Sequence, residues 1–540
     1  MPSYIKGRKS KKNKQQDAEN KAVVQSDDHI QESLSANLAI ISQKTGNSSD
    51  VVVRQLKLGR NSDIKTAIVY IEGIVDNQSI QEFLLQSMMK DDEKEKLIQE
   101  DALDRISEDM MTVGNVSASN TWDDLFLSLM AGDTIILVDG IAKALSASTQ
   151  GGEKRSISES TTQMVVRGPK GAFTESIATN TSMVRRIIKT PDLWMESFKV
   201  GRVTKTDVTL MYINGIANDQ VVDEVRQRIN KIDIDSILES GYIEQLIEDQ
   251  TMTPFPTIFN TERPDVVAGN LFEGRIAIFV DGTPFVLIAP AVFIQFFQSA
   301  EDYYVRYDIA TSIRLLRILM FFISLIAPAS FVAVTTFHQE MVPTTLIVAI
   351  AAQREAVPFP AFVEALLMEL TFEILREAGI RLPKAIGSAV SIVGALVIGQ
   401  AAVQASIVSP AMVIIVSITA IASFATPSFD MAISVRLLRF LFMIGAATFG
   451  FYGIILILLM MVVHLSGLRS FGVPYMAPFA PFIPLNNGDT FIRLPWWTLR
   501  QRPRLISANT RREGKSKHPQ PPASRGMVNR DFKEGGSNEA

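Results

Sequence analysis

The chain has 540 residues, a net charge of −4, four histidines and no cysteine. This length exceeds that of a usual single domain, so we expect several domains. The small net charge argues against a nucleic-acid-binding protein. A sequence without cysteine has no disulfides, thiol nucleophiles or cysteine-ligated metals, and four histidines make a zinc site improbable. We therefore expect no metal, no cofactor and no nucleic-acid partner.

Residues 1–50 are predicted to form a basic disordered tail. No apolar segment of the kind found in a signal peptide follows its basic start. The N-terminal part is therefore expected to stay in the cytoplasm. The basic residues either attract anionic membrane lipids or form a solvated tail. They are Lys6, Arg8, Lys9, Lys11, Lys12 and Lys14.

Three segments of the polar half recur at a constant distance along the chain. LKLGR at 56–60 returns as FKVGR at 198–202, IVYIEGIVDNQ at 68–78 returns as LMYINGIANDQ at 210–220, and GDTIILVDG at 132–140 returns as GRIAIFVDG at 274–282. We call this common displacement the repeat spacing. A shared displacement without gaps indicates a repeated module. We therefore predict a soluble α/β N-terminal part made of two tandem duplicated subdomains, residues 51–150 and 198–300.

Each predicted subdomain begins with a β-branched and aromatic strand and ends on a strand followed by Asp-Gly. Asp139 and Asp281 could be paired catalytic acids, but Asp-Gly at a strand end is ordinary turn chemistry. Neither copy carries a nearby histidine or glycine-rich phosphate loop. The soluble part is therefore predicted to serve binding and assembly, and we expect no enzyme.

Residues 151–197 are predicted to connect the two subdomains. They include RGPKGAFTESIATNTSMVRRII, a stretch rich in glycine, threonine, asparagine and arginine without an apolar run. Such side chains usually bond to backbone groups, here of this chain or of a neighbouring subunit. The candidate interdomain or subunit contacts are Arg167, Gly168, Pro169, Phe173, Glu175, Asn180, Arg185 and Arg186.

Residues 312–465 are predicted to form an all-α transmembrane domain with about four full spans. An apolar helix of about 20 residues crosses a bilayer. Segment 342–352 is too short and is expected to be a half-span, and the basic tail 466–540 favours a cytoplasmic C-terminus. Termini on the same side require an even number of crossings. The predicted full spans are 318–337, 386–404, 407–426 and 439–463.

Four glutamates interrupt this apolar region, in PFPAFVEALLMELTFEILREAGIRLP. On a helical wheel Glu369, Glu373, Arg376 and Glu377 share one face, whereas Glu364 points away from it. A carboxylate facing acyl chains costs at least about 2.5 kcal/mol. The acidic face therefore either lies along the membrane interface or lines a wet cavity formed with other subunits, and both alternatives remain open.

These segments resemble a known family. RGPKGAFTESIATNTSMVRRII, the Pro-rich acidic motif and AIGSAVSIVGALVIGQAAVQASIVSP are similar to the A subunits of the spore germinant receptors, the GerA family of endospore-forming bacteria. The resemblance covers about residues 50–485. It implies a multi-pass protein of the spore inner membrane that acts with receptor B and C subunits, self-associates as a homo-oligomeric ring, and forms a cation channel gated by a nutrient.

The resemblance makes a ligand-gated channel or signalling subunit our first hypothesis. Acidic rings attract cations in channels, so Glu364, Glu369 and Glu373 are candidate cation-path residues, with Val357 and Val363 as a candidate hydrophobic gate. A second hypothesis is a secondary transporter of amino acids or ions that uses these carboxylates. The repeated SIRLLRIL and SVRLLRFL segments are its only support. A scaffold whose acidic helix lies on the membrane is a third.

Overall fold

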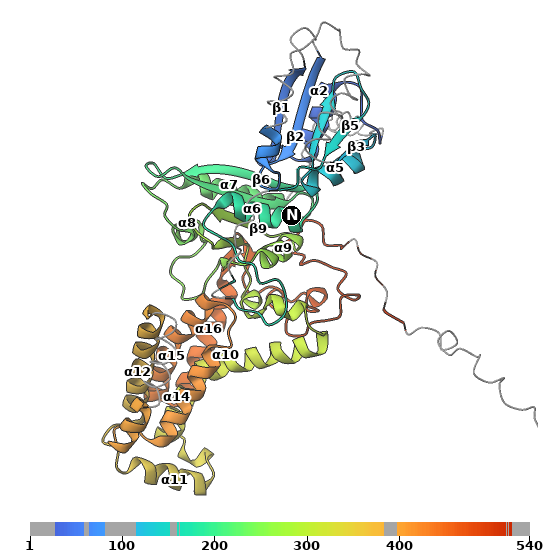
Figure 1. The fold of residues 1–540 in the computed structure, drawn as a ribbon. Helices are drawn as coiled ribbons and strands as arrows, with labels where there is room; N and C mark the ends of the chain where they lie inside the picture. Colours follow the sequence, from blue (N-terminus) through green and yellow to red (C-terminus); the bar gives the residue numbers. More distant parts are fainter. Residues whose placement is uncertain are drawn as a thin grey trace, which may run out of the picture.

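The computed structural model shows an α/β part joined to a helical bundle (Figure 1). Positions 1–27 lie outside the described part of the chain. The structure describes residues 28–58, 64–81, 115–151, 159–160, 163–382 and 397–512, with isolated positions up to 520.

The first subdomain is built on an antiparallel five-stranded sheet with the order β1-β2-β4-β5-β3. Alternate residues of β2 enter opposite cores, with Val69 in one cluster and Ile68 in the other. This alternation explains why the central strands are apolar throughout. The elements are α2 (Leu34–Lys44), β1 (Val51–Leu58), β2 (Ile64–Ile71), β3 (Val116–Ser119), α5 (Trp122–Ala131), β4 (Thr134–Val138) and β5 (Ala144–Ala147).

The second subdomain has an antiparallel sheet of corresponding order, β6-β7-β9-β10-β8. Figure 1 shows it between the first subdomain and the helical bundle. Its elements are α6 (Ile177–Ile187), β6 (Leu193–Val200), β7 (Thr206–Ile213), α7 (Asp219–Lys231), α8 (Ser240–Ile247), β8 (Phe259–Thr261), α9 (Pro264–Phe272), β9 (Ile276–Val280) and β10 (Val286–Ala289).

The two sheets agree residue by residue in register. Val51 lies opposite Ile71 in the first sheet, and Leu193 lies opposite Ile213 in the second, so both partners are displaced by the repeat spacing. The same displacement relates the other strand pairs of the two sheets. The constant spacing in the sequence therefore corresponds to equivalent positions in two sheets of one topology.

Helix α2 lies within the segment 1–50, which we expected to be a disordered tail. Three apolar side chains, Ile30, Leu34 and Ile41, are buried in the core of the first subdomain. Their burial makes the chain from Ile30 onward part of the folded subdomain, and the expected boundary at position 50 is wrong. Our tail prediction for residues 1–27 concerns positions outside the described residues.

Helix α6, in the predicted connector, is the counterpart of α2. Asn37 accepts from the backbone N–H of Gln31 and donates to its carbonyl, at 3.0 and 2.6 Å. Asn180 makes the same two bonds with Thr174, at 2.7 and 2.6 Å. A buried amide that bonds both backbone groups of one residue fixes the entry to each helix. The repeated unit therefore includes the helix that precedes the first strand.

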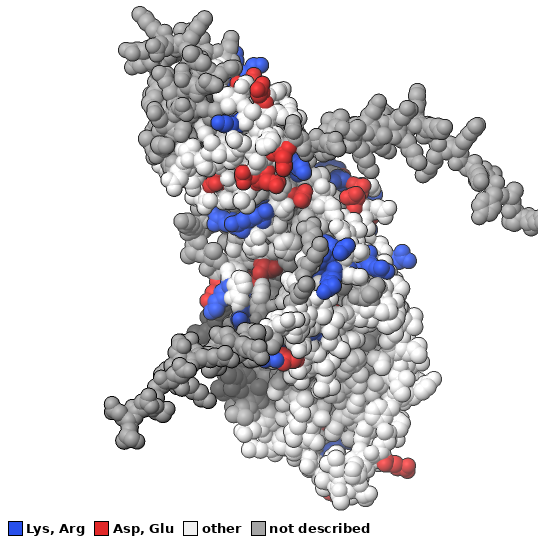
Figure 2. Space-filling model, turned by 90° about the vertical axis from the view of Figure 1, so that its right-hand side faces the viewer, with Lys and Arg blue, Asp and Glu red and all other residues white. Residues whose placement is uncertain are grey.

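The bundle contains the two described helices that are long and apolar enough to cross a membrane, α10 and α15, with mean hydropathies of 2.3 and 1.6. Two shorter apolar helices, α14 and α16, pack beside them. In Figure 2 the lower part of the visible face is almost free of charged residues, unlike the α/β part above it. The helices are α10 (Tyr307–Thr336), α11 (Thr344–Arg354), α12 (Ala361–Arg381), α14 (Pro410–Ser423), α15 (Phe429–Phe449) and α16 (Phe451–Gly467).

The predicted span 439–463 is two helices, because the chain reverses at Gly450, where φ is +60°. Helices α15 and α16 then pack so closely that a Cβ on Gly453 would lie 2.1 Å from the carbonyl oxygen of Gly445. The prediction of one long span is therefore wrong. Part of the predicted span 386–404 lies outside the described residues.

The chain returns from α16 to the α/β part. Residues 500–512, here called the C-terminal strap, pack against the second subdomain. Ser507 forms a β-bridge with Ala217, and the Ala508 N–H donates to the carbonyl of Ile216 at 2.9 Å. The segments before and after the bundle therefore lie on the same side of any bilayer that the bundle crosses.

The strap takes a position that a local segment takes in the first subdomain. There, Gln150 forms a β-bridge with Val75, and the Gly151 N–H donates to the carbonyl of Ile74 at 3.0 Å. Val75 and Ile74 precede Ala217 and Ile216 by the repeat spacing. In the second subdomain, the chain that follows β10 leads toward the bundle. The strap therefore bonds to Ile216 and Ala217 in place of such a local segment.

Candidate functional site

The candidate site is a line of charged side chains inside the bundle, which we call the polar seam. Helix α12 supplies its acids, and α11 and α15 supply its bases. Its members are Arg354, Glu364, Glu369, Glu373, Arg436 and Arg439.

Glu364 is fully buried where α11, α12 and α14 meet. It accepts hydrogen bonds from the backbone N–H and hydroxyl of Ser409, at 3.0 and 2.8 Å, and from Arg354 Nε at 3.2 Å. Ser409 is also the N-cap of α14. A carboxylate beside a helix N-terminus is stabilised by the unpaired N–H groups there. Glu364 therefore fastens the start of α14 to α12.

Glu369 pairs with Arg439 of α15, and both side chains are almost fully buried. The Arg439 Nε also donates to the carbonyl of Ser324 on α10, at 2.8 Å. Within the described part of the chain, Glu369 Oε1 and Arg439 Nη2 have no hydrogen-bond partner. An ion pair that is buried but incompletely bonded contributes little net stability, although removing one partner is costly.

Glu373 lies one turn further along α12 and accepts from Arg436 Nη1 at 2.6 Å. Its side chain is 42% exposed, which makes it the most accessible acid of the seam. Arg376 places its guanidinium over the ring of Phe424, at 5.3 Å. The predicted polar face thus follows a line of contacts between helices.

The structure differs from the wheel prediction in what this face meets. Glu369 and Glu373 were expected to meet the interface or a shared wet cavity, but in this chain each pairs with an arginine of α15. Glu364, which pointed away from the stripe, is the most buried of the three. The candidate gate residues Val357 and Val363 are half-buried, before and within the first turn of α12. A helical wheel gives directions but not neighbours, so it missed the pairing.

The arginine partners carried a sequence signal in the repeated SxRLLR motif. Its second copy supplies Arg436 and Arg439 to the seam. Its first copy supplies Arg314 and Arg317, and both bind Asp302 at 2.9 Å where α10 begins. The motif therefore marks two bundle helices, α10 and α15, whose arginines bind acids on other elements. In the seam, three glutamates face three arginines, so its charge is balanced.

The comparison with protein families decides the family. The model of the Bacillus/Clostridium GerA spore germination protein matches residues 39–505. The chain belongs to the GerA family. This result confirms the resemblance seen in the acidic motif.

Two relatives of this GerA-family chain match over almost their whole length. The chain is 61% identical to spore germination protein KA of Bacillus subtilis (strain 168), over 94% of this chain and 93% of the relative. It is 46% identical to the uncharacterized membrane protein YfkQ of the same organism, over 90% and 93%. The chain also matches a crystal structure, that of the N-terminal domain of the A subunit of the Bacillus megaterium spore germinant receptor GerK3. The sequences are 66% identical, and the match covers 50% of this chain and 98% of that chain, with a TM-score of 0.41.

The connector residues join the two subdomains of the GerA-family chain. Arg185, 1% exposed, makes a bidentate ion pair with Asp50, with Nε–Oδ2 and Nη2–Oδ1 distances of 2.9 and 3.1 Å. Arg186 is exposed and donates to the carbonyl of Gly151 at 2.6 Å. A planar, bidentate, buried pair holds a defined geometry. Arg185 therefore fixes the two subdomains against each other.

The beginning of the RGPKG segment packs against the approach to the bundle. Gly168 has a φ of +132°, and a Cβ there would lie 2.6 Å from the Tyr304 ring. The carbonyl of Pro169 accepts from Arg263 at 2.9 Å, whereas Arg167 is exposed. Glycine is required at this position because the ring covers the backbone.

The next two candidates, Phe173 and Glu175, contact the second subdomain, one through its ring and the other through its backbone. The buried ring of Phe173 meets that of Phe279 edge to face, 5.7 Å between centroids. Glu175 contributes its backbone carbonyl, which accepts from the Gly282 N–H at 2.8 Å, and its side chain is exposed. These contacts lie within the chain and position the segment.

The second subdomain meets the bundle through polar groups at the start of α15. Asn260 of β8 donates to Asp430 at 2.6 Å. Glu244 of α8 lies in the same region, and burial, together with the nearby negative charges of Asp430 and Glu248, raises its pKa to about 8. The junction therefore contains a carboxyl group that changes charge near neutral pH.

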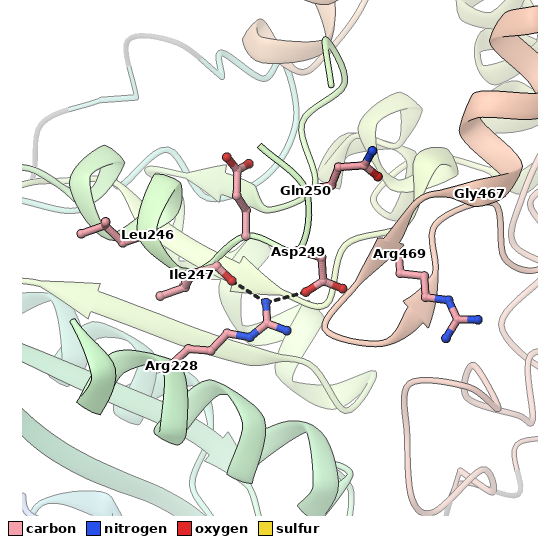
Figure 3. Close-up of a pocket in the computed structure, with 8 residues that line it drawn as sticks. Arg228, Leu246, Ile247, Asp249, Gln250, Gly467 and Arg469 are labelled. Atoms are coloured by element: carbon pink, nitrogen blue, oxygen red, sulfur yellow. Dashed lines mark hydrogen bonds and ion pairs between the residues drawn. The ribbon is translucent and has the colours of Figure 1, made fainter. Parts of the chain in front are cut away.

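A hollow of about 520 Å³ lies between α8 and the end of α16 (Figure 3). Arg228 donates to the carbonyl of Ile247 at 2.6 Å and pairs with Asp249. The Arg469 side chain points away from Arg228 (Figure 3). Arg228 also lies over the Phe471 ring at 4.6 Å. The Arg228 guanidinium is therefore already bonded to groups of this chain. Among the described residues no group of three metal-ligating side chains is present.

Proposed function

We propose that this chain is the A subunit of a nutrient germinant receptor in the spore inner membrane. It acts with receptor B and C subunits, and its α/β part lies in the cytoplasm. It is a channel or signalling subunit rather than an enzyme. Support comes from the family match over residues 39–505 and from the shared side of the strap and the α/β part.

The polar seam is the observation that carries the channel proposal. A line of acids and bases through an apolar bundle is costly unless it is paired, and charged groups within membrane segments usually mark a pathway. The seam is closed in the single chain because its acids bind arginines. Opening in a homo-oligomeric ring separates α12 from α15 and leaves acids on a cation path, with Val357 and Val363 as the gate.

The test measures rubidium efflux from vesicles that contain the complete A, B and C receptor, after addition of a panel of amino acids and sugars. Glu373→Gln is the informative variant, because Glu373 is partly exposed and its loss should not disturb folding. We expect lower cation flux or altered selectivity. Glu377→Gln is the control, since Glu377 is exposed and pairs with Arg381 at the end of α12.

Unchanged flux and selectivity in Glu373→Gln would contradict the seam as a cation path. The secondary-transporter alternative rests on Glu369 Oε1, a buried oxygen without a partner among the described residues, which could bind a coupling ion. It predicts substrate counterflow by the A subunit alone. A channel predicts flux without counterflow.

We also propose that the two subdomains arose by tandem duplication. The support is the repeat spacing, which is common to the sequence and to the register of both sheets. The solved structure of a distant family member would test this proposal, because both sheets should retain corresponding registers there. Sheets of different strand order in such a relative would contradict it.

A further inference from the structure

The segment that follows α16 exposes several large apolar side chains. Two of the most exposed are Phe482, at 69%, and Trp496, at 53%. A patch of exposed large apolar side chains marks a surface that contacts another protein or a membrane. We call this surface the aromatic anchor, and its exposed members are Phe482, Phe491, Ile492, Leu494 and Trp496.

The aromatic anchor lies beside the first residues of α10. The ring of Trp497 meets that of Tyr307, the first residue of α10, with 6.2 Å between centroids. The backbone N–H of Arg493 donates to the Thr311 hydroxyl, one turn into the helix, at 3.2 Å. The anchor is therefore at the level where α10 leaves the α/β part and enters the bundle.

Buried polar contacts hold the anchor in place. Asp489 accepts from Arg314 Nη1 and from the Tyr303 hydroxyl, both at 2.8 Å. Arg493 lies over the ring of Trp496 at 5.0 Å. These contacts orient the exposed rings, so their exposure is a property of the fold rather than of a loose tail.

We propose that the aromatic anchor inserts into the headgroup layer of the bilayer, next to the point where α10 enters. Tryptophan with arginine is typical of this layer, because the ring is apolar and its N–H is polar. The surface continues onto α10 through exposed Tyr307, whose ring meets that of Trp497. Exposed Arg500, whose Nε donates to the Trp497 carbonyl at 3.4 Å, adds positive charge beside it, which suits lipid phosphates.

Arg493 gives a second, independent indication of a phosphate nearby. It is 3% exposed, and within the described residues its Nε and Nη2 have no hydrogen-bond partner. Phosphate oxygens are strong acceptors for a guanidinium group. The guanidinium lies against the Trp496 ring, so a lipid phosphate supplies these acceptors only when that ring moves aside. This inference rests on the proposed membrane location.

The experiment uses the full chain with its receptor partners in vesicles of phosphatidylcholine and phosphatidylglycerol. Some lipids carry a spin-label quencher, either near the headgroup or deep in the acyl chain. We expect shallow quenching of the tryptophan emission from this region, because Trp496 belongs to the anchor and Trp497 lies next to it. The double variant Trp496→Phe with Trp497→Phe should lose this quenching, since Trp122 and Trp194 lie in the α/β part.

Flotation of the vesicles distinguishes failure of the proposed membrane location from failure of the proposed anchor. Protein that does not float with the vesicles contradicts the membrane location and, with it, the anchor. Protein that floats but shows no quenching contradicts the anchor alone and indicates that another protein surface covers it. Stronger quenching by the deep label would also overturn the headgroup placement. Arg500→Gln should weaken shallow quenching only in vesicles that contain phosphatidylglycerol.

Discussion

Glu369 of α12 pairs with Arg439 of α15 in the interior of the bundle, where the two side chains are 3% and 4% exposed. The pair links two helices of the bundle and, through the bond from Arg439 to the Ser324 carbonyl, a third. A contact of this kind specifies which faces meet, because a charge left alone in that place is unstable.

Glu369→Ala should therefore destabilise the chain by about 3–5 kcal/mol, the usual cost of leaving one buried charge unpaired. The apolar double replacement Glu369→Leu with Arg439→Met should recover most of this loss. Thermal unfolding in detergent micelles measures both. Glu377→Ala, which removes an exposed pair, should cost no more than about 0.5 kcal/mol. Equal losses in the single and double variants would show that the pair is not the cause.

Arg185→Ala should loosen the joint between the subdomains, because Asp50 would remain buried without its partner. The expected cost is about 3–5 kcal/mol. Arg186→Ala is the matched control, since the neighbouring side chain is exposed and makes one bond to a carbonyl. Protease cleavage near Asp50 of the full chain should accelerate in the first variant only. Similar cleavage in both would contradict the role of Arg185.

Gly274→Ala should release the C-terminal strap. Its φ is +86°, and an added Cβ would meet Ser507 at 2.8 Å and the Ile216 carbonyl at 2.9 Å. Gly282→Ala is the control, because φ is +89° and nothing lies within 4 Å. Both variants lose about 1–2 kcal/mol from the left-handed backbone. Only Gly274→Ala should expose the strap to trypsin, and equal exposure would disprove the contact.

The stability of the chain should depend on pH through Glu244. Its folded-state pKa is raised from 4.5 to about 8, so the protonated form favours the folded state. This contribution is complete below pH 4.5 and is lost as the pH rises to about 8. Glu244→Gln should flatten that part of the curve of melting temperature against pH. Gln245→Asn, a neutral change on the exposed side of α8, should leave the slope as it is.

The strands of the two sheets could be predicted from the sequence because each repeated segment occurs twice at a constant spacing. Each strand of one copy supports the corresponding strand of the other, and β-branched runs mark them. The bundle was harder, since the apolar stretch 439–463 has no break in hydropathy. Gly450 was the available signal, and it becomes decisive only when two helices are seen to meet at Gly445 and Gly453.

The arginine partners of the acidic helix could have been found from the repeated SxRLLR motif, but not assigned to particular glutamates. Pairing depends on which helices are neighbours, and a wheel of one helix holds no such information. The strap shows the same limit. The bridge between Ala217 and Ser507 joins distant segments without a periodic pattern, so only the folded chain reveals it.

The strap also sets an order of events during synthesis. Ala217 leaves the ribosome long before Ser507, and the whole bundle is made between them. The first subdomain closes this edge with its own next residues, whereas the second can close it only after the last helix and the strap have been made. A chain that stops before the strap therefore has an incomplete second subdomain. A completed edge shows that the whole bundle has been translated.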